Sequence, residues 1–145
     1  MLSIKSLLFA ILSVFAVADQ VVFNDCQLAK PYGIIKSLDI TPKPAPGVTI
    51  QVTAVVDLIK DISVTTWDLE IDFIGIPVET ADGNLCVSVG DFTANCPANA
   101  GTTLIIKGEH LVPFETPIGD YTIIFTTITN KVTSLCASFN FSLTM

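Results

Sequence analysis

His110 is the residue of this 145-residue chain best suited to acid–base chemistry, because it is the single histidine. A serine hydrolase would need it beside an activated serine, yet the sequence has no Gly-x-Ser-x-Gly turn to present one. A lone histidine outside any motif is more often a polar residue at a strand end or in a loop. We therefore interpret His110 as structural and expect no enzymatic activity.

Three acidic residues, Asp68, Glu70 and Asp72, alternate along one segment and could form a carboxylate pair or a cation site. In a strand they would share one face, about 7 Å apart at successive steps. Because apolar residues lie between them, a solvated outer face explains them better. A single histidine and the lack of a Cys-x₂-Cys spacing argue against zinc. We expect neither a metal nor a cofactor.

Four cysteines, Cys26, Cys86, Cys96 and Cys136, indicate two disulfides formed in an oxidising compartment. Three connectivities fit that count. We favour the nested one, in which Cys86 and Cys96 close a short loop rich in turn-forming residues, and Cys26 and Cys136 join the first strand to the last. The second bridge would remove roughly 4–5 kcal/mol of unfolded-state entropy on the chain-entropy model.

The first 18 residues have the features of a secretory signal peptide. Lys5 supplies a positive charge, residues 7–17 are almost entirely apolar, and a small-x-small cleavage pattern ends at Ala18. The apolar run is shorter than the ~20 residues that span a bilayer, so a retained anchor is the less favoured alternative. We expect residues 1–18 to be removed and residues 19–145 to form one domain, secreted or in the endolysosomal lumen.

Composition excludes two classes of protein. Half of the residues are apolar, 14% are charged and the mean hydropathy is +0.65, which excludes a disordered tail. The formal net charge is −7 and the chain has no arginine. We therefore expect no binding to nucleic acid, because nucleic-acid binders use cationic groups to displace phosphate counterions.

The elements that must position these residues are strands, because apolar and polar residues alternate with a period of two. Runs of this kind lie at residues 49–56, 67–73, 103–107, 121–126 and 138–143. Breaks rich in proline, glycine or asparagine lie at residues 41–47, 81–84, 97–101 and 113–119. About seven such strands without a long helix predict an all-β, two-sheet antiparallel β-sandwich.

The inward-facing residues of these strands would form either a dry core or, where the sheets splay apart, the wall of an apolar tunnel. A tunnel could hold a lipid, because an acyl chain of about fifteen methylenes gains on the order of 12 kcal/mol on leaving water. The residues expected to line the tunnel are Val52, Trp67, Leu69, Ile71, Phe73, Leu104, Ile106, Tyr121, Ile123 and Phe125. The alternation alone does not separate lining residues from plain core.

Asn140-Phe141-Ser142 is an N-glycosylation sequon. Its neighbours Phe139, Phe141 and Leu143 form the apolar set of one strand. Asn140 should therefore point outward, where a glycan could be attached.

Several short motifs follow one another along the chain: Cys26, Ile40-Thr41-Pro42 with a proline-rich turn to Gly47, Asn84-Leu85-Cys86, Cys96-Pro97, Gly101, Pro113, Pro117-Ile118-Gly119-Asp120-Tyr121 and Cys136. Their order and spacing resemble the MD-2-related lipid-recognition (ML) domain family, the family of the Niemann–Pick type C2 proteins. The resemblance covers essentially the whole chain after residue 18. It implies an immunoglobulin-like β-sandwich, a monomer, one lipid held between the two sheets, and the nested disulfides.

The turn at residues 41–47 indicates a branch within that family. Sterol-binding animal members carry a third disulfide there, whereas this chain has prolines and no cysteine. In this it is similar to the phosphatidylglycerol/phosphatidylinositol transfer proteins, which implies phospholipid transfer with transient membrane contact. The alternatives are a sterol carrier, a lipid-presenting co-receptor that acts through a protein partner, and a packed sandwich without a ligand.

Two features bear on the headgroup and the membrane. Without arginine, an anionic headgroup would rely on lysines such as Lys43, Lys60 or Lys107. A loop tip with Leu111, Val112 and Phe114 is expected to expose apolar side chains to a membrane or a protein partner. Because the chain is acidic, we expect transfer to be faster near pH 5 than near pH 7.

Overall fold

The computed structural model describes residues 19–144, which form ten strands and contain no helix. The strands are β1 (Asp19–Gln20), β2 (Phe23–Asn24), β3 (Gly33–Thr41), β4 (Thr49–Leu58), β5 (Thr65–Phe73), β6 (Ile76–Asn84), β7 (Phe92–Ala94), β8 (Thr103–Leu111), β9 (Gly119–Thr129) and β10 (Val132–Leu143). One sheet has the order β1-β3-β4-β8-β7 and the other β2-β10-β9-β5-β6, with every pairing antiparallel. The predicted all-β, two-sheet antiparallel sandwich is confirmed.

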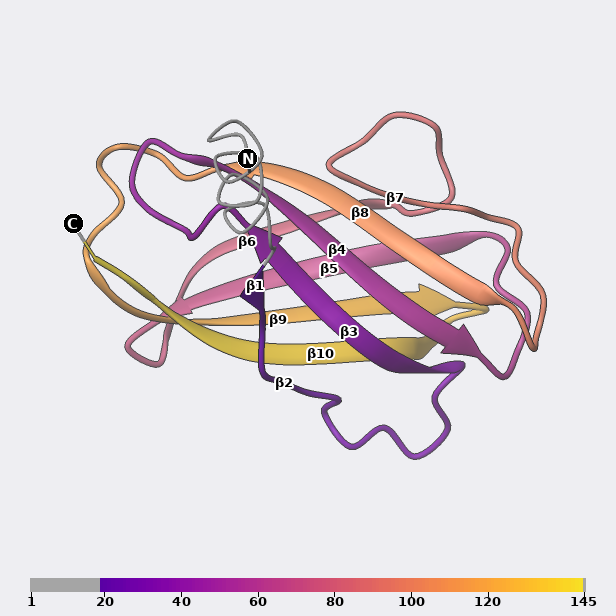
Figure 1. The fold of residues 1–145 in the computed structure, drawn as a ribbon. Coiled ribbons are helices and arrows are strands. Elements are labelled where there is room, and N and C mark those ends of the chain that lie inside the picture. The colour runs from indigo at the N-terminus through magenta and orange to yellow at the C-terminus, as the bar shows by residue number, and fades with distance from the viewer. Residues whose placement is uncertain (1–18, 145) are drawn as a thin grey trace, which may run out of the picture.

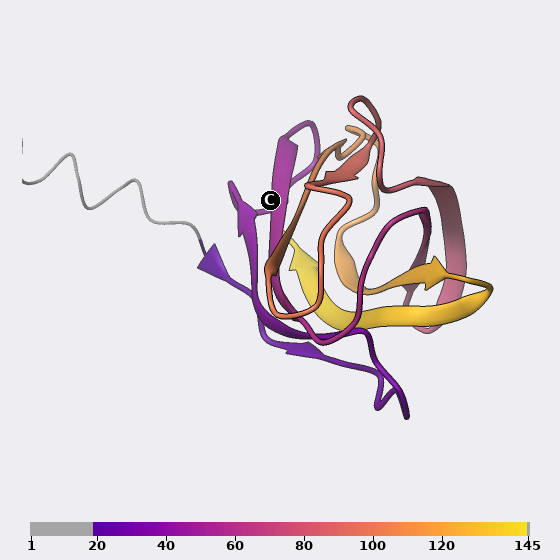
Figure 2. The same cartoon turned by 90° about the vertical axis from the view of Figure 1, so that its right-hand side faces the viewer.

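The two sheets lie face to face, and their strands cross obliquely (Figure 1). Figure 2 shows the same two layers from one end. Residues 42–48, 74–75 and 112–118 connect strands at one end of the sandwich, which we call the mouth end; it lies on the left in Figure 1. Residues 59–64, 95–102 and 130–131 lie at the opposite end, the far end.

Two tight hairpins fix the register of the second sheet. Ile74 and Gly75 join β5 to β6 with φ of 49° and 77°, and Asn130 and Lys131 join β9 to β10 with φ of 52° and 65°. Two successive positive φ angles characterise type I′ turns, whose twist matches that of the flanking strands. After a register shift between Thr133 and Leu135, the β9–β10 pair runs unbroken in alignment from Leu135 to Leu143.

The predicted break at residues 81–84 is wrong, because these residues belong to β6 and pair with β5. Gly83 lies opposite Trp67, and a Cβ atom on Gly83 would lie 2.9 Å from the indole Nε1 atom. Glycine is therefore used here for a close approach of side chain to backbone rather than for a turn. Pairing with β5 overrides the local turn preference of Asp82, Gly83 and Asn84.

The first strand was also predicted wrongly. It was expected to contain Cys26, but β2 ends at Asn24 and Cys26 lies in a turn with φ of 58°. The nested disulfide pairing is confirmed. Cys26 joins Cys136 across a sequence separation of 110, the long disulfide, and Cys86 joins Cys96 across 10, the short disulfide.

Apolar side chains between the sheets form two clusters. The far-end cluster centres on Trp67, which is 2% exposed, with Val56, Leu85 and Leu104 buried beside it. The mouth-end cluster includes Leu38, Ile40, Ile50, Val112, Tyr121, Phe139 and Leu143. Strands β4, β5 and β9 contribute to both, so the interior is continuous along the sandwich.

The predicted signal peptide, residues 1–18, lies outside the described residues. Between residues 19 and 144, no helix is long and apolar enough to cross a membrane.

Candidate functional site

A cavity of about 80 Å³ lies between the sheets where the two apolar clusters meet. We call it the inner cavity. Strands β3, β4, β7 and β8 line it from one sheet, and β5, β9 and β10 line it from the other. The side chains that line it are apolar, apart from His110 and the disulfide-bonded Cys136.

Aromatic rings close the inner cavity toward the far end. Phe92 and Phe125 line the cavity with their ring centroids 5.0 Å apart. Trp67 packs behind both, edge-on to Phe92 at 4.8 Å and stacked on Phe125 at 6.1 Å. Such aromatic pairs add stability beyond the area they bury, so this end of the cavity has a well-packed floor.

A second, open pocket of about 390 Å³ lies at the mouth end, and we call it the outer pocket. Its wall includes Phe73, Tyr121 and Phe141, and its edge carries the exposed carboxylates Glu79 and Glu115. Four residues line both spaces: Ile50, Ile71, His110 and Ile123. The inner cavity and the outer pocket are therefore neighbours along one path from the mouth end into the interior.

Tyr121 forms a fixed part of the outer pocket. Its ring stacks on Phe141 with the centroids 5.3 Å apart and lies 4.8 Å from Phe73. Its hydroxyl donates a 2.7 Å hydrogen bond to the Pro117 carbonyl, which attaches the 112–118 loop to β9. Burial raises the pKa of Tyr121, so the phenol stays protonated and presents an uncharged wall.

The structure divides the ten predicted lining residues into three groups. Six line the inner cavity: Val52, Leu69, Ile71, Ile106, Ile123 and Phe125. Phe73 and Tyr121 line the outer pocket, together with Ile71 and Ile123. Trp67 and Leu104 line neither, because they lie at the far end where the facing side chains pack directly together. We therefore assign Trp67 and Leu104 to the core.

Sequence reasoning missed twelve of the 18 residues that line the inner cavity, and two of these, Phe92 and His110, show why. Phe92 lies on the three-residue strand β7, which is too short to show alternation. His110 lies near the end of β8, as expected for a polar residue, but it is half-buried and faces the interior. Leu104, Ile106, Gly108 and His110 are successive inward positions of that strand, so extending the alternation past residue 107 would have found it.

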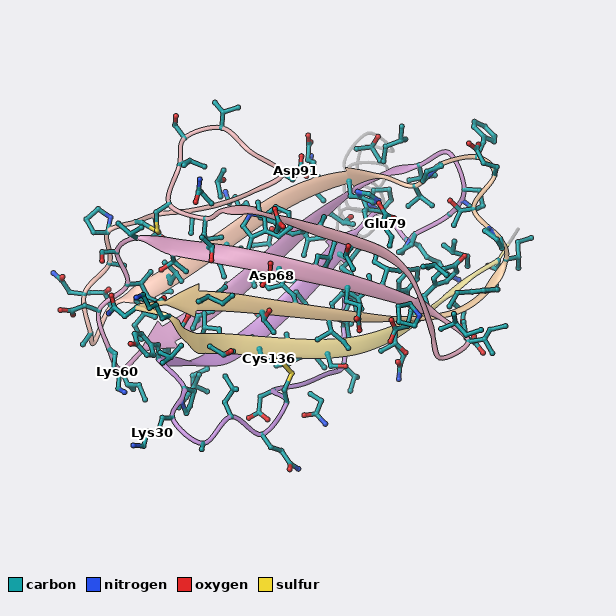
Figure 3. The ribbon with its side chains drawn as sticks, turned by 180° about the vertical axis from the view of Figure 1, so that it is seen from behind. Lys30, Lys60, Asp68, Glu79, Asp91 and Cys136 are labelled. Atoms are coloured by element: carbon teal, nitrogen blue, oxygen red, sulfur yellow. A yellow bond between two sulfur atoms is a disulfide. The ribbon has the colours of Figure 1, made fainter. Side chains whose placement is uncertain are left out.

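The acidic run on β5 does not gather into a site. Asp68 is exposed, whereas Glu70 and Asp72 are half-buried on the face of the sheet turned away from the cavity. Figure 3 shows Asp68 on this outer layer. In the part of the chain that the structure describes, no group of three or more His, Cys, Asp or Glu residues is placed to hold a metal ion.

Asn140 is exposed on β10, and its Oδ1 atom accepts a 2.7 Å hydrogen bond from the Thr122 hydroxyl. The expected outward direction of this side chain is therefore observed. Attachment of a glycan stays a prediction.

An antiparallel β-sandwich with an apolar cavity that adjoins a pocket at one end belongs to the class of folds that enclose small apolar ligands. The family comparison is specific: the family model described as "ML domain" matches residues 20–143. The chain therefore belongs to the ML-domain family, whose fold is a lipid-binding one. The phosphatidylglycerol/phosphatidylinositol branch stays a prediction.

Solved structures show the same fold. A Niemann–Pick type C2 protein from the Japanese carpenter ant aligns with a TM-score of 0.65 at 16% identity, covering 85% of this chain and 99% of that one. Chicken MD-1, in complex with lipid IVa, aligns with a TM-score of 0.59 at 18% identity over 86% and 95%. The C-terminal domain of wzt aligns at 0.58 and 11% identity over 86% and 78%. The predicted immunoglobulin-like sandwich is thus confirmed; a search of curated proteins found no match.

Proposed function

We propose that this chain binds one lipid between its two sheets and carries it between membranes. The observation that supports this most is the apolar inner cavity joined by four shared residues to the outer pocket. A relative of the same fold, chicken MD-1, forms a complex with lipid IVa, which supports a lipid as the ligand class. A carrier needs no bond chemistry, only a sheath that keeps hydrocarbon away from water.

The two spaces suggest how a lipid would be held. Ligand pockets commonly measure about 300–1,000 Å³, a range that the outer pocket reaches at about 390 Å³ and the inner cavity at about 80 Å³ does not. We infer that the ligand occupies the outer pocket and inserts part of its chain into the inner cavity, which widens to receive it. Each methylene buried there would contribute about 0.8 kcal/mol.

Exposed apolar residues around the mouth end support transient membrane contact. Phe114 is 82% exposed, and its ring lies against Gly47, where a Cβ atom would lie 2.7 Å from it. Exposed Leu111 and Ile118 flank this loop, and the β5–β6 hairpin exposes Ile74 and Ile76 at the same end. Val112 was wrongly expected in this set: it is 6% exposed and packs in the mouth-end cluster.

The charges near the outer pocket bear on the lipid class. Of the charged residues between 19 and 144, Glu79 and Glu115 line it and no lysine does. Figure 3 places Lys60 toward the far end, and Lys107 lies on the outer face of β8, so neither can reach a headgroup in the outer pocket. Lys43 lies in the 42–48 connection at the mouth end but does not line the outer pocket. These positions favour an uncharged lipid, such as the sterol alternative, over phosphatidylglycerol or phosphatidylinositol.

Native mass spectrometry of the protein purified from a secreting eukaryotic culture tests the ligand. We expect a lipid adduct of one per chain, identified after extraction. Failure to detect an adduct, together with no uptake of labelled lipid from vesicles, would refute the proposal. The same preparation tests secretion, cleavage after residue 18, and Asn140 glycosylation, which would appear as a gel shift after glycosidase treatment.

Transfer between vesicles tests the membrane contact. Phe114→Ser should slow transfer by about tenfold, because membrane insertion of the ring buries a large apolar side chain. Val132→Ser is the matched control, since Val132 is also exposed but lies on the hairpin at the far end. Equal slowing by both replacements would contradict docking through the mouth end.

A further inference from the structure

His110 lies at the boundary between the two spaces of the candidate site. Within residues 19–144 it is the one ionisable side chain that lines both the inner cavity and the outer pocket. It pairs in register with Ile50 on β4, and Ile71 and Ile123 of the opposite sheet complete the boundary. A ligand that enters the inner cavity from the mouth end must therefore pass the imidazole.

The imidazole has no hydrogen-bonding partner among the described residues. The other polar side chains of the outer pocket are Tyr121, which is hydrogen-bonded, Glu79 and Glu115, which are exposed, and Thr116, which is half-buried but does not line the inner cavity. The Tyr121 hydroxyl donates its hydrogen bond to the Pro117 carbonyl, and Glu79 and Glu115 are exposed to solvent at the edge of the pocket. A half-buried polar side chain in an apolar wall is stabilised when a ligand supplies the missing hydrogen bond, because an unsatisfied buried polar group costs free energy. The imidazole is thus the polar group that lines both spaces and has hydrogen-bonding capacity left for a ligand.

The surrounding charge limits what that ligand group can be. Glu79 on β6 and Glu115 in the 112–118 loop are the charged side chains that line the outer pocket, and both carry negative charge at neutral pH. A carboxylate or phosphate bound at His110 would face both of them, and no lysine among the described residues lines the outer pocket to compensate. An uncharged polar group meets no such repulsion.

We infer that His110 recognises the hydroxyl group of an uncharged lipid and so determines which lipids the protein accepts. A neutral imidazole has one N–H donor and one nitrogen acceptor, and a hydroxyl group both donates and accepts, so the two match. Part of the hydrocarbon would extend from His110 into the inner cavity, and the rest of the ligand would occupy the outer pocket. This inference rests on the proposed function, because it assigns the lipid head within the same site.

Three probes with one hydrocarbon chain test it: oleyl alcohol, methyl oleate and oleate, each measured at pH 8 with the full secreted chain. Wild-type protein should bind the alcohol more tightly than oleate. His110→Leu should weaken alcohol binding by about tenfold, roughly the effect of one or two lost hydrogen bonds. It should weaken methyl oleate less, because the ester only accepts. His110→Gln, which keeps a donor and an acceptor, should restore alcohol binding to within about threefold.

Lys107→Gln is the control, because Lys107 lies on the same strand but points away from the cavity. Fluorescence of Trp67, the single tryptophan, checks that each variant is folded. Alcohol binding that His110→Leu leaves unchanged would overturn the role of His110 while leaving lipid binding intact. Tighter binding of oleate than of alcohol, lost in His110→Leu, would overturn the hydroxyl assignment. If none of the probes binds the wild-type chain, the proposed function itself fails.

Discussion

Replacing Ala54 with leucine tests whether the space between the sheets receives hydrocarbon. Ala54 is a half-buried residue at the middle of β4, the central strand of its sheet, and it lines the inner cavity. Its neighbours in register are Leu38 on β3 and Ile106 on β8. A leucine at this position would extend three further carbon atoms into the cavity.

The two consequences of Ala54→Leu differ in size. A cavity of about 80 Å³ destabilises the fold by about 2 kcal/mol, which filling it would recover, while strain from the larger side chain costs about 1–3 kcal/mol. The free energy of unfolding should therefore stay within about 1 kcal/mol of wild type. A ligand kept from burying three methylenes loses about 2.4 kcal/mol, which weakens its binding about fiftyfold.

Displacement of a fluorescent long-chain lipid measures the affinity, and urea unfolding followed by Trp67 fluorescence measures the stability. Thr53→Leu is the matched control, because it adds a leucine to the neighbouring position on the opposite face of the strand. Wild-type affinity in a folded Ala54→Leu variant would refute the reasoning, since the ligand would then not use the inner cavity. An equal loss of affinity in Thr53→Leu would refute it as well.

Three further predictions concern stability. Replacing both cysteines of the long disulfide with serine should lower the free energy of unfolding by about 5 kcal/mol, and the same change at the short disulfide by about 3 kcal/mol. The difference arises because the two bridges close loops with sequence separations of 110 and 10. Equal losses in urea unfolding would contradict this. Because burial raises the pKa of Tyr121, the folded state holds the phenolic proton more tightly, and the resulting stability is complete below about pH 10 and lost as the pH rises through the raised value. Unfolding measured from about pH 8 to 11 should therefore show a steeper decline for wild type than for Tyr121→Phe, and parallel curves would count against it. Gly83→Ala should destabilise the fold by about 1–3 kcal/mol and shift the Trp67 emission, because the added Cβ atom would lie 2.9 Å from the indole; an unchanged melting temperature and spectrum would show that the ring moves freely.

The strands that alternation predicted are those whose two faces meet different surroundings. Residues 67–73 have polar residues outside and apolar residues inside, and they form β5 nearly as expected. Strand β6, which was missed as were β3 and the short β7, lies at a sheet edge with most of its residues exposed, so burial imposes no period of two on it. Asp82 and Gly83 therefore predicted a turn, because their pairing with β5 is visible only in the folded chain.

The candidate site shows even more clearly which features the sequence predicts and which only the folded structure decides. Trp67 and Ile71 occupy equivalent inward positions of β5, yet Trp67 is core and Ile71 lines both spaces. Nothing in their spacing separates them, because the separation between facing sheets depends on side chains contributed by distant strands. Phe92 and Phe125 are 33 positions apart in the sequence, and their rings come into contact only when the two sheets pack together.

The sequence by itself predicted the β-sandwich, a favoured pairing of the cysteines and the family, because period, turn chemistry and motif order are local properties of the chain. The tertiary structure alone decided where the interior stays open and which side chain stands at the passage into it. The position of His110 at the boundary of the two spaces depends on residues from both sheets that surround it. Because these residues are far apart in the chain, no local sequence pattern reveals their arrangement.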